Sequence, residues 1–498
     1  MNIGDTEFIE RKLLPELARR IPATRWYAEK SVADPDFSIF DMLVIEECGT
    51  VYLLIEVRTE GFRKNIYSVP VLMGVEPKTP NPLEMEIFAM GQSIMVSDAL
   101  YSETYWDSFR NFLLTGKRLE TMHGSVIFEL ENMGEKHLHP TVRTVRVISS
   151  EQSNSSVVIN DDMIFKHVRK IVPGNNPDYD VPSYLWSNTN FRNTPKPVGK
   201  VTYLRDGVTY HLGSLTLFLR SSKECWTYFS DLISSVLSNI TGEEAPDNVL
   251  ELLKGCRRIG QITSELHTAL SQDSNLPDFG PSKIVPSDVF DWKSEYNSLV
   301  KQFFMAWDHM PPNDVKEKFD RFVRREGFRE SLETIAENID LLKDGTRYKI
   351  RVHGDYHLGQ VLWTGEDFMI IDFEGEPIRT LQYRNSKFCP LKDLAGMLRS
   401  FDYAVKNSLL SAPSTDVVEK FAARLQEEMR NEFLGSYLQS NDSTLPILPS
   451  YPEEFRKVLM FYEAEKAIYE CLYEMGSRPA FLSIPLGKLM ELAGEQQE

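Results

Sequence analysis

The 498-residue sequence contains few cysteines. The chain has five, at Cys48, Cys225, Cys256, Cys389 and Cys471. No two of them are close enough for a CxxC pair, and an odd number does not suit a disulfide framework. Reduced thiols of this kind are typical of the cytoplasm, where we expect the protein to act.

Signals for export and for membrane insertion are also lacking. Residues 1–23 alternate acidic, basic and apolar side chains and contain no apolar core of a signal peptide. No segment approaches the roughly 18 consecutive apolar residues that a membrane-spanning helix needs. The sequence therefore predicts no membrane association.

Positive charge is in deficit. The chain has 55 Lys and Arg against 73 Asp and Glu, a formal net charge of −18 at pH 7, and no local basic block is large enough to reverse that field. Such a field repels the phosphates of DNA and RNA, so we expect no nucleic-acid partner. The hydrophobic fraction of 42% and the charged fraction of 26% are those of an ordinary globular chain.

The residue patterns divide the chain into three parts. An amphipathic helix and short β-prone runs, the last of which ends at Pro70, predict a β-rich cap subdomain over residues 1–110. Further strands with one helix predict a small lobe over residues 111–220. Residues 221–498 have mainly helical periodicity, interrupted by a β-rich segment at 348–373. This α+β order suggests a two-lobed phosphotransferase.

The most distinctive segment reads HGDYHLGQVLW at residues 353–363 and DFEGEP at 372–377. It predicts a polar loop, a strand, a turn, and a second strand that ends on a carboxylate. Such a hairpin brings Asp372 back beside the loop that holds Asp355 and Gln360. Phosphoryl transfer uses this set, because one carboxylate accepts the proton of the attacking hydroxyl and oxygen ligands hold Mg²⁺ on the nucleotide phosphates. A pair of turn-capping aspartates is the alternative interpretation.

These motifs resemble those of the aminoglycoside-phosphotransferase-like kinases, which have a protein-kinase-like fold. More narrowly, they are similar to those of the bacterial maltokinases, which make maltose 1-phosphate with ATP. The similarity continues through residues 386–403 and 467–486, and reaches the N-terminal part only through its size and Arg25-Trp26-Tyr27. The resemblance implies a bilobal eukaryotic-protein-kinase-like fold with an N-terminal β-rich cap.

The same resemblance implies roles for the hairpin residues. Asp355 would be the general base, and Gln360 and Asp372 would be the Mg²⁺ ligands, with Gln360 standing where many of these kinases have Asn. His353 and His357 lie four residues apart, but no HExxH or paired-cysteine spacing accompanies them, which disfavours a zinc site.

A nucleotide site is implied in the small lobe. The maltokinases have a Ser/Asn-rich turn in place of a glycine-rich phosphate loop, and small hydroxyl residues allow close approach to phosphate oxygens. The corresponding residues here are Ser153, Asn154, Ser155 and Ser156. An exposed polar turn is the alternative interpretation.

The remaining nucleotide contacts would come from a lysine and a hinge. Lys166 would bind the α- and β-phosphates and pair with Asp180, where most relatives have Glu, or in part with Asp178. The segment that contains Leu217 and Leu219 would contact adenine, although a buried strand predicts the same residues.

The sugar contacts are less well defined by the sequence. Aromatic faces pack on sugar C–H groups and charged side chains bind hydroxyls. The candidates are His357, Glu374, Glu376, Arg399, Tyr469 and Glu474. Tyr469 and Glu474 lie on the C-terminal helix, whose aromatic stripe could instead face the hydrophobic core.

The resemblance thus implies an ATP- and Mg²⁺-dependent maltokinase whose product feeds glucan synthesis, with maltose as substrate and a trehalose synthase as a possible partner. A kinase of the same fold for another sugar, such as glucosamine, is one alternative. A catalytically silent sugar- or nucleotide-binding relative is another, and the joint presence of Lys166, Asp355, Gln360 and Asp372 argues against it.

Overall fold

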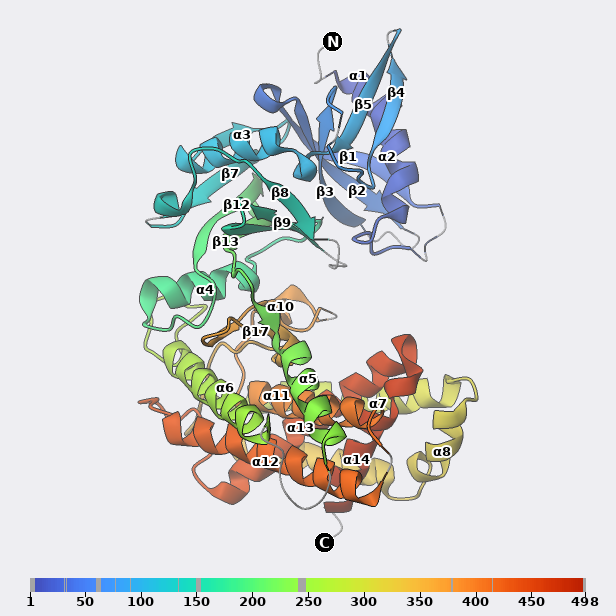
Figure 1. The fold of residues 1–498 in the computed structure, drawn as a ribbon, viewed down its shortest axis with the longest axis vertical. Coiled ribbons are helices and arrows are strands. Elements are labelled where there is room, and N and C mark those ends of the chain that lie inside the picture. The colour runs from blue at the N-terminus through green and yellow to red at the C-terminus, as the bar shows by residue number, and fades with distance from the viewer. Residues whose placement is uncertain are drawn as a thin grey trace. The chain divides into compact units, whose positions relative to one another are not determined.

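The computed structural model describes residues 5–495 except 31, 33, 60–63, 77, 90, 133, 149–153, 241–247, 378 and 414. The chain forms two compact units, residues 1–186 with 195–220 (unit 1) and residues 187–194 with 221–498 (unit 2) (Figure 1). The five cysteines are free and buried. Among the described helices, none is both long and apolar enough to span a membrane.

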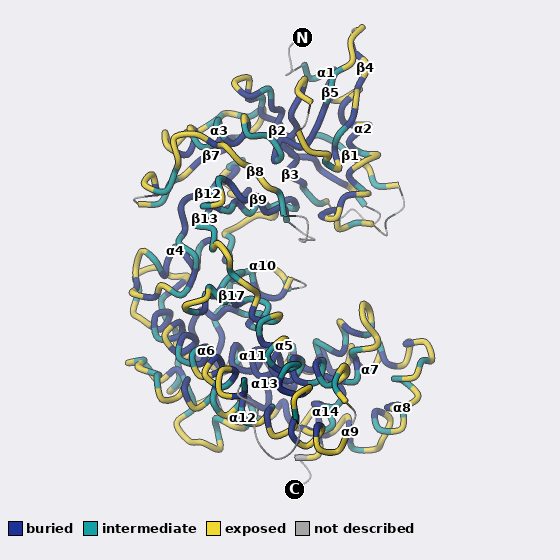
Figure 2. The backbone as a smooth tube through the Cα atoms, viewed as in Figure 1, coloured by how far each residue is buried: buried dark blue, intermediate teal, exposed yellow. Residues whose placement is uncertain are grey.

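Unit 1 begins with an antiparallel sheet of strand order β1-β2-β3-β5-β4, in which β3 also pairs with β11. The strands are β1 (Asp36–Ile45), β2 (Thr50–Arg58), β3 (Lys64–Met73), β4 (Met85–Ala89), β5 (Gln92–Asp98) and β11 (Lys170–Ile171). The short helices α1 (Thr6–Phe8) and α2 (Leu14–Arg20) pack on one face. β2 is buried along almost its whole length (Figure 2), because its alternate side chains enter two different hydrophobic cores.

The predicted end of a strand at Pro70 is wrong, because β3 continues to Met73. The backbone N–H of Ser68 points away from β2 and donates to the Arg169 carbonyl. Pro70, two residues on, has its nitrogen on the same side. It falls between the residues of β3 that pair with β11 and those that pair with β5. The missing N–H therefore costs no strand pairing.

A second antiparallel sheet follows, with strand order β6-β7-β12-β13-β10-β9-β8. The strands are β6 (Arg118–Glu120), β7 (Ser125–Leu130), β8 (Val145–Ile148), β9 (Asn154–Ile159), β10 (Met163–Val168), β12 (Pro197–Arg205) and β13 (Val208–Leu217). Helix α3 (Glu103–Leu114) packs Trp106 and Phe109 edge-on against Phe165 of β10. The same core contains Tyr52 and Leu54 of β2, so the two sheets share one hydrophobic core. Helix α4 (Pro177–Asn188) completes this part.

Unit 2 is mainly helical. Its helices are α5 (Cys225–Ser238), α6 (Asn248–Leu270), α7 (Pro286–His309), α8 (Asp314–Val323), α9 (Phe328–Ile335), α10 (Leu381–Arg384), α11 (Leu391–Leu409), α12 (Asp416–Ser440), α13 (Pro452–Ser477) and α14 (Ser483–Glu495). A small sheet joins β14 (Lys223–Glu224), β17 (Val361–Trp363) and β18 (Phe368–Ile370), and a second joins β15 (Ser282–Lys283) and β16 (Tyr348–Lys349). The predicted hairpin is thus present as β17 and β18, and it stands in a helical frame in which α11 packs on α13 and α6 on α12.

The close approach of α6 and α12 depends on a glycine. A Cβ atom at Gly260 would lie 2.1 Å from Ser436 Oγ and 2.4 Å from the Phe433 carbonyl oxygen. Any larger residue must therefore push the two helices apart.

We expect Gly260→Ala to lower the free energy of unfolding by about 1–3 kcal/mol through overpacking. Gly435→Ala is the matched control, since Gly435 is exposed on α12 and its added Cβ would meet no atom within 4 Å. That control should stabilise the helix by about 0.5–1 kcal/mol. Denaturant unfolding of both variants measures this, and equal effects of the two substitutions would contradict the packing argument.

Candidate active site

The loop that carries Asp355 is anchored by a buried carboxylate in the first turn of α11. Asp393 accepts hydrogen bonds from the backbone N–H groups of His353 (2.7 Å) and Gly354 (2.9 Å). His267 Nε2, from α6, lies 3.1 Å from the same carboxylate. Burial acts to raise the pKa of Asp393, but the hydrogen bond from His267 and those from the loop keep it below its ordinary value. Asp393 is therefore an ionised anchor for the loop.

Two further bonds fix the ends of this loop. His353 Nε2 lies 2.9 Å from the Ile371 carbonyl oxygen, which ties the start of the loop to the end of the hairpin. The backbone N–H of Leu358 donates to Ser400 Oγ of α11 (3.0 Å). Through the first of these contacts, His353 braces the loop against the hairpin.

Asp355 is held by a lysine from the C-terminal helix α13. Lys466 Nζ lies 2.8 Å from Asp355 Oδ1 and 2.9 Å from Glu376 Oε1, so one ammonium bridges two carboxylates. The ammonium also lies 4.8 Å from the ring centroid of Tyr469. These contacts assemble residues that are about 110 positions apart in the sequence.

This arrangement sets the charge of Asp355. Burial acts to raise its pKa, but the nearby Lys466 ammonium, followed by His357, lowers it to about 2. His357 Nε2 lies 3.9 Å from Asp355 Oδ2. Burial is the main reason that the pKa of His357 is lowered below its ordinary value. At neutral pH the structure therefore presents an ionised Asp355 beside a neutral imidazole.

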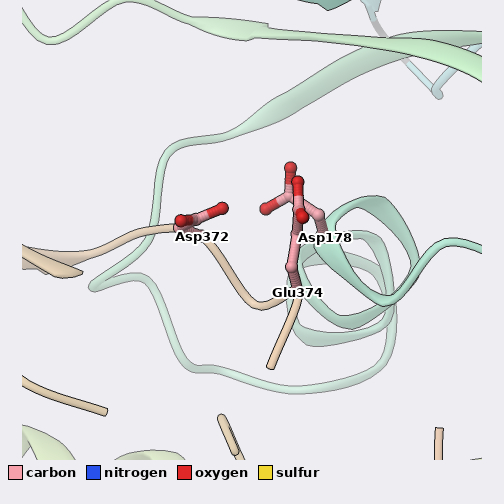
Figure 3. A group of neighbouring side chains, drawn as sticks. All are labelled: Asp178, Asp372 and Glu374. Carbon is pink, nitrogen blue, oxygen red and sulfur yellow. The ribbon is translucent and has the colours of Figure 1, made fainter. Parts of the chain in front are cut away.

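The predicted metal ligands meet at the end of the hairpin. Gln360 Nε2 lies 3.0 Å from Asp372 Oδ2. Asp372 adopts a left-handed backbone conformation with φ of 63°, which is strained for a residue with a Cβ and turns its carboxylate out of the strand direction. Figure 3 shows Asp372 and Glu374 on the same loop, and their carboxylate oxygens lie within 4.8 Å of one another. Figure 3 also shows Asp178, which belongs to α4.

This donor set suits a hard divalent cation. Carboxylate and amide oxygens are the ligands that Mg²⁺ prefers, and a half-turn of the Gln360 amide presents its oxygen where its nitrogen now lies. Asp372, Gln360 and Glu374 of unit 2 therefore fit the predicted metal.

In unit 1 the described residues among the predicted phosphate-binding set lie in a strand and not in the expected turn. Ser153 lies outside the described residues. Asn154, Ser155 and Ser156 do not form a turn but the start of β9, because they pair with Val168, His167 and Lys166 of β10. The side chains of Ser155 and Ser156 are buried. Their phosphate contacts stay a prediction, and burial argues against direct contact by these two hydroxyls.

Lys166 has an acidic neighbour on α4. Its Nζ lies 3.1 Å from Asp178 Oδ2, the residue considered as the second acidic partner. The pairing with Asp180, on the same helix, stays a prediction. Leu217 ends β13, its N–H donates to the Lys196 carbonyl (2.9 Å), and Leu219 follows just before the chain enters unit 2.

The predicted sugar ligands fall into two groups. Glu376, Tyr469 and His357 gather around Asp355 and Lys466, and Glu374 lies near Asp372. Arg399 is buried on α11, where its guanidinium pairs with Asp402 (2.9 Å) and Glu470 (2.7 Å).

Glu474 is also buried, 2.8 Å from Arg478 and 3.3 Å from the Tyr403 hydroxyl. The sugar contacts of Arg399 and Glu474 stay predictions, and their ion pairs argue for a structural role.

Sequence patterns did not single out Lys466 or Asp393. Lys466 lies within a helix otherwise described by its tyrosines and glutamates, and Asp393 lies 40 residues after His353, beyond the end of the motif at Pro377. One signal was available, since Lys466 is the one basic residue between Lys457 and Arg478 in a helix rich in Glu.

Next to this site lies a cavity of about 430 Å³ within unit 2. One side is a face of α7, where Asp288, Asp291, Trp292 and Glu295 recur at helical spacing. Tyr383 lies on another side. The cavity lining thus combines aromatic rings and carboxylates with the ammonium groups of Lys349 and Lys387.

Comparisons with known proteins agree with this chemistry. Residues 144–375 match the model of the phosphotransferase enzyme family. A glucosamine kinase from Mycolicibacterium smegmatis is 23% identical over 358 residues, which are 71% of this chain and 81% of that protein. A glucosamine kinase from Streptacidiphilus jiangxiensis is 22% identical over 355 residues, 70% of this chain and 74% of that protein.

The fold is also that of a solved enzyme. A glucosamine kinase in complex with glucosamine, ADP and inorganic phosphate matches with a TM-score of 0.65 at 16% identity, over 96% of this chain and 98% of that one. The predicted α+β kinase-like fold is thereby confirmed. Residues 144–375 thus match the phosphotransferase enzyme family, and the chain is similar to phosphotransferases in both sequence and fold.

Proposed function

We propose that this chain is an ATP-dependent sugar kinase. The observation that carries the proposal is the ionised, buried Asp355, which Lys466 holds on a loop that ends at Gln360, beside Asp372 from the end of the hairpin. The family match over this segment supports the reaction class. The named relatives support a sugar as acceptor.

In this reaction a sugar hydroxyl attacks the γ-phosphorus of ATP, a new O–P bond forms, and the bond to the β-phosphate oxygen breaks to release ADP. The hydroxyl proton goes to Asp355. In the loose transition state of phosphoryl transfer the attacking oxygen gains little bond order. Asp355, with a pKa of about 2, therefore acts chiefly by accepting the hydroxyl's hydrogen bond and orienting it.

The other residues divide between the phosphates and the acceptor. Lys166 would bind the α- and β-phosphates. Mg²⁺, held by Gln360, Asp372 and Glu374, would supply positive charge to the phosphates. Lys466 and Glu376 keep the Asp355 carboxylate in one orientation.

Two acceptors have specific support. Glucosamine is favoured because the two relatives described above are glucosamine kinases. The cavity is lined by the carboxylates Asp288, Asp291 and Glu295, of which Asp288 pairs with Lys349 and Glu295 with Arg379, and the ammonium group of an amino sugar would bind at their remaining oxygens. Glu295 pairs with Arg379, which lies 3.2 Å from Glu376, so contacts run from the cavity to the Asp355 site.

Maltose is the second candidate, and it rests on the similarity of residues 352–377 and 386–403 to the maltokinases. With maltose, the product would be maltose 1-phosphate for glucan synthesis, and association with a trehalose synthase would follow. With glucosamine as the acceptor, neither that product nor that association would be expected.

The first test measures ADP formation with Mg²⁺ and glucosamine, maltose, glucose, trehalose or no sugar. We expect sugar-dependent turnover that falls at least about 100-fold in Asp355→Asn, because the amide that replaces the ionised carboxylate cannot take the hydroxyl proton. Glu366→Gln, at the exposed turn of the same hairpin, is the control and should retain full activity. Nucleotide binding without turnover on any sugar would contradict the kinase and favour a silent relative.

A second test concerns the metal. Gln360→Ala removes one oxygen ligand and should raise the Mg²⁺ concentration for half-maximal activity by about tenfold or more, whereas Gln360→Asn retains an oxygen and should lie nearer the wild type. The titration is run at saturating ATP and sugar. An unchanged Mg²⁺ requirement in Gln360→Ala would remove this residue from the metal site.

A third test uses pH. The depressed pKa of Asp355 predicts no acid limb from this residue above about pH 4 in wild-type kcat/KM. Lys466→Met removes the charge that lowers this pKa, so burial acts unopposed and the acid limb should move up by about 1–3 pH units. The stability that ionised Asp355 contributes is present above its unfolded pKa of about 4 and lost as pH falls towards 2. An unchanged pH profile in Lys466→Met would contradict the assigned coupling.

A further inference from the structure

Arg169 is a buried cation between the two sheets of unit 1. Its side chain is 1% exposed. Its Nη2 pairs with Asp98, and its Nε donates to Ser155 Oγ at 2.9 Å. The guanidinium lies 4.8 Å from the ring centroid of Trp26. One side chain therefore contacts the N-terminal sheet and the first residues of β9 together.

The backbone around Arg169 makes the same connection. β10, which carries Lys166, ends at Val168 in the second sheet, and β11 begins at Lys170 in the first. Arg169 is the residue between them, and its carbonyl accepts the N–H of Ser68 of β3 (2.7 Å). The strand of the predicted phosphate-binding lysine thus passes directly into the N-terminal sheet.

Both partners of Arg169 in the N-terminal part are themselves fixed. Asp98 ends β5, and its Oδ1 accepts the backbone N–H of Leu100 at 3.1 Å. Trp26 packs within the core of the first sheet, with its ring centroid 5.8 Å from that of Tyr67. Trp26 belongs to the Arg25-Trp26-Tyr27 segment, to which catalysis gives no role.

A second polar contact lies beside the first. His167 Nε2 is 3.2 Å from Ser68 Oγ, which is 2.7 Å from the Tyr52 hydroxyl. His167 is the register partner of Ser155. Burial is the main cause that lowers the pKa of His167 well below its ordinary value, so this contact is between neutral groups. Two charged groups of the β10–β11 segment contact the N-terminal part, Arg169 at Asp98 and Lys170, whose Nζ lies 2.7 Å from Glu29 Oε1, and of these only Arg169 also binds β9.

We propose that Arg169 is a positioning residue that fixes the start of β9 and the adjoining end of β10, the strand that carries Lys166, to the N-terminal sheet through Ser155, Asp98 and Trp26. The inference rests on the proposed kinase function and extends it to the N-terminal part. That part then serves nucleotide binding without contacting the nucleotide.

Energetics support a positioning role over a stabilising one. A fully buried ion pair loses the hydration of both charges and is often no more stable than an apolar replacement. Nη1 of Arg169 makes no hydrogen bond to any described residue, which adds to that cost. What the pair supplies is a defined geometry, because the guanidinium has donors in a fixed plane and one of them is directed at Ser155.

The test measures dissociation constants of ADP and of ATP with Mg²⁺, by calorimetry without turnover. Ser155→Ala removes only the link to β9, and we expect about tenfold weaker nucleotide binding. Arg169→Lys keeps a cation near Asp98 but lacks the planar donors, so it should weaken binding similarly. Arg143→Gln, an exposed arginine before β8, is the control and should bind as the wild type does.

Kinetics separate positioning from general loss of structure. For folded variants at matched melting temperature, KM for ATP should rise about tenfold while KM for the sugar stays within about twofold. If Ser155→Ala binds nucleotide as tightly as the wild type, the inference is overturned even where Arg169 variants unfold. Absence of nucleotide binding by the wild type would instead overturn the proposed kinase.

Discussion

One buried ammonium determines the state of the site in unit 2. Lys466 bridges Asp355 and Glu376, two carboxylates that would otherwise repel each other at buried positions. Because the bridge is within hydrogen-bond distance of both, Asp355 stays ionised although burial opposes its charge. The helix that supplies Lys466 is the same helix on which α7, α11 and α14 pack, so the charge is fixed by the core of the unit.

The backbone of the same loop is held by a second buried charge, Asp393. Asp393 binds two loop N–H groups from the first turn of α11, and His267 orients that carboxylate from α6. Asp355 is thus positioned through its loop by α6 and α11, and through its side chain by α13. A carboxylate fixed in this way loses little further freedom when it binds a hydroxyl, which is the condition for catalysis by orientation.

Features formed by residues close together in the sequence could be predicted, whereas contacts between residues far apart in the sequence could not. The hairpin β17–β18, the loop with Asp355 and Gln360, and the neighbourhood of Asp372 were predictable, because motif and strand pattern lie within about 25 residues. The continuation of β3 beyond Pro70 depended on a gap between two partner strands, and the contact between Asp355 and Lys466 depended on how α13 packs. The placement of Ser155 and Ser156 in β9 followed from their pairing with β10, which the serine-rich composition did not reveal.

The geometry of the site requires that Lys466 and Asp355 are energetically coupled through their buried ion pair. A double-mutant cycle tests it most directly, with the free energy of unfolding measured for the wild type, Asp355→Asn, Lys466→Met and the double variant at pH 7. We expect the double variant to lose less stability than the two single losses combined, with a coupling of at least about 1 kcal/mol. Additive losses, with a coupling near zero, would contradict it.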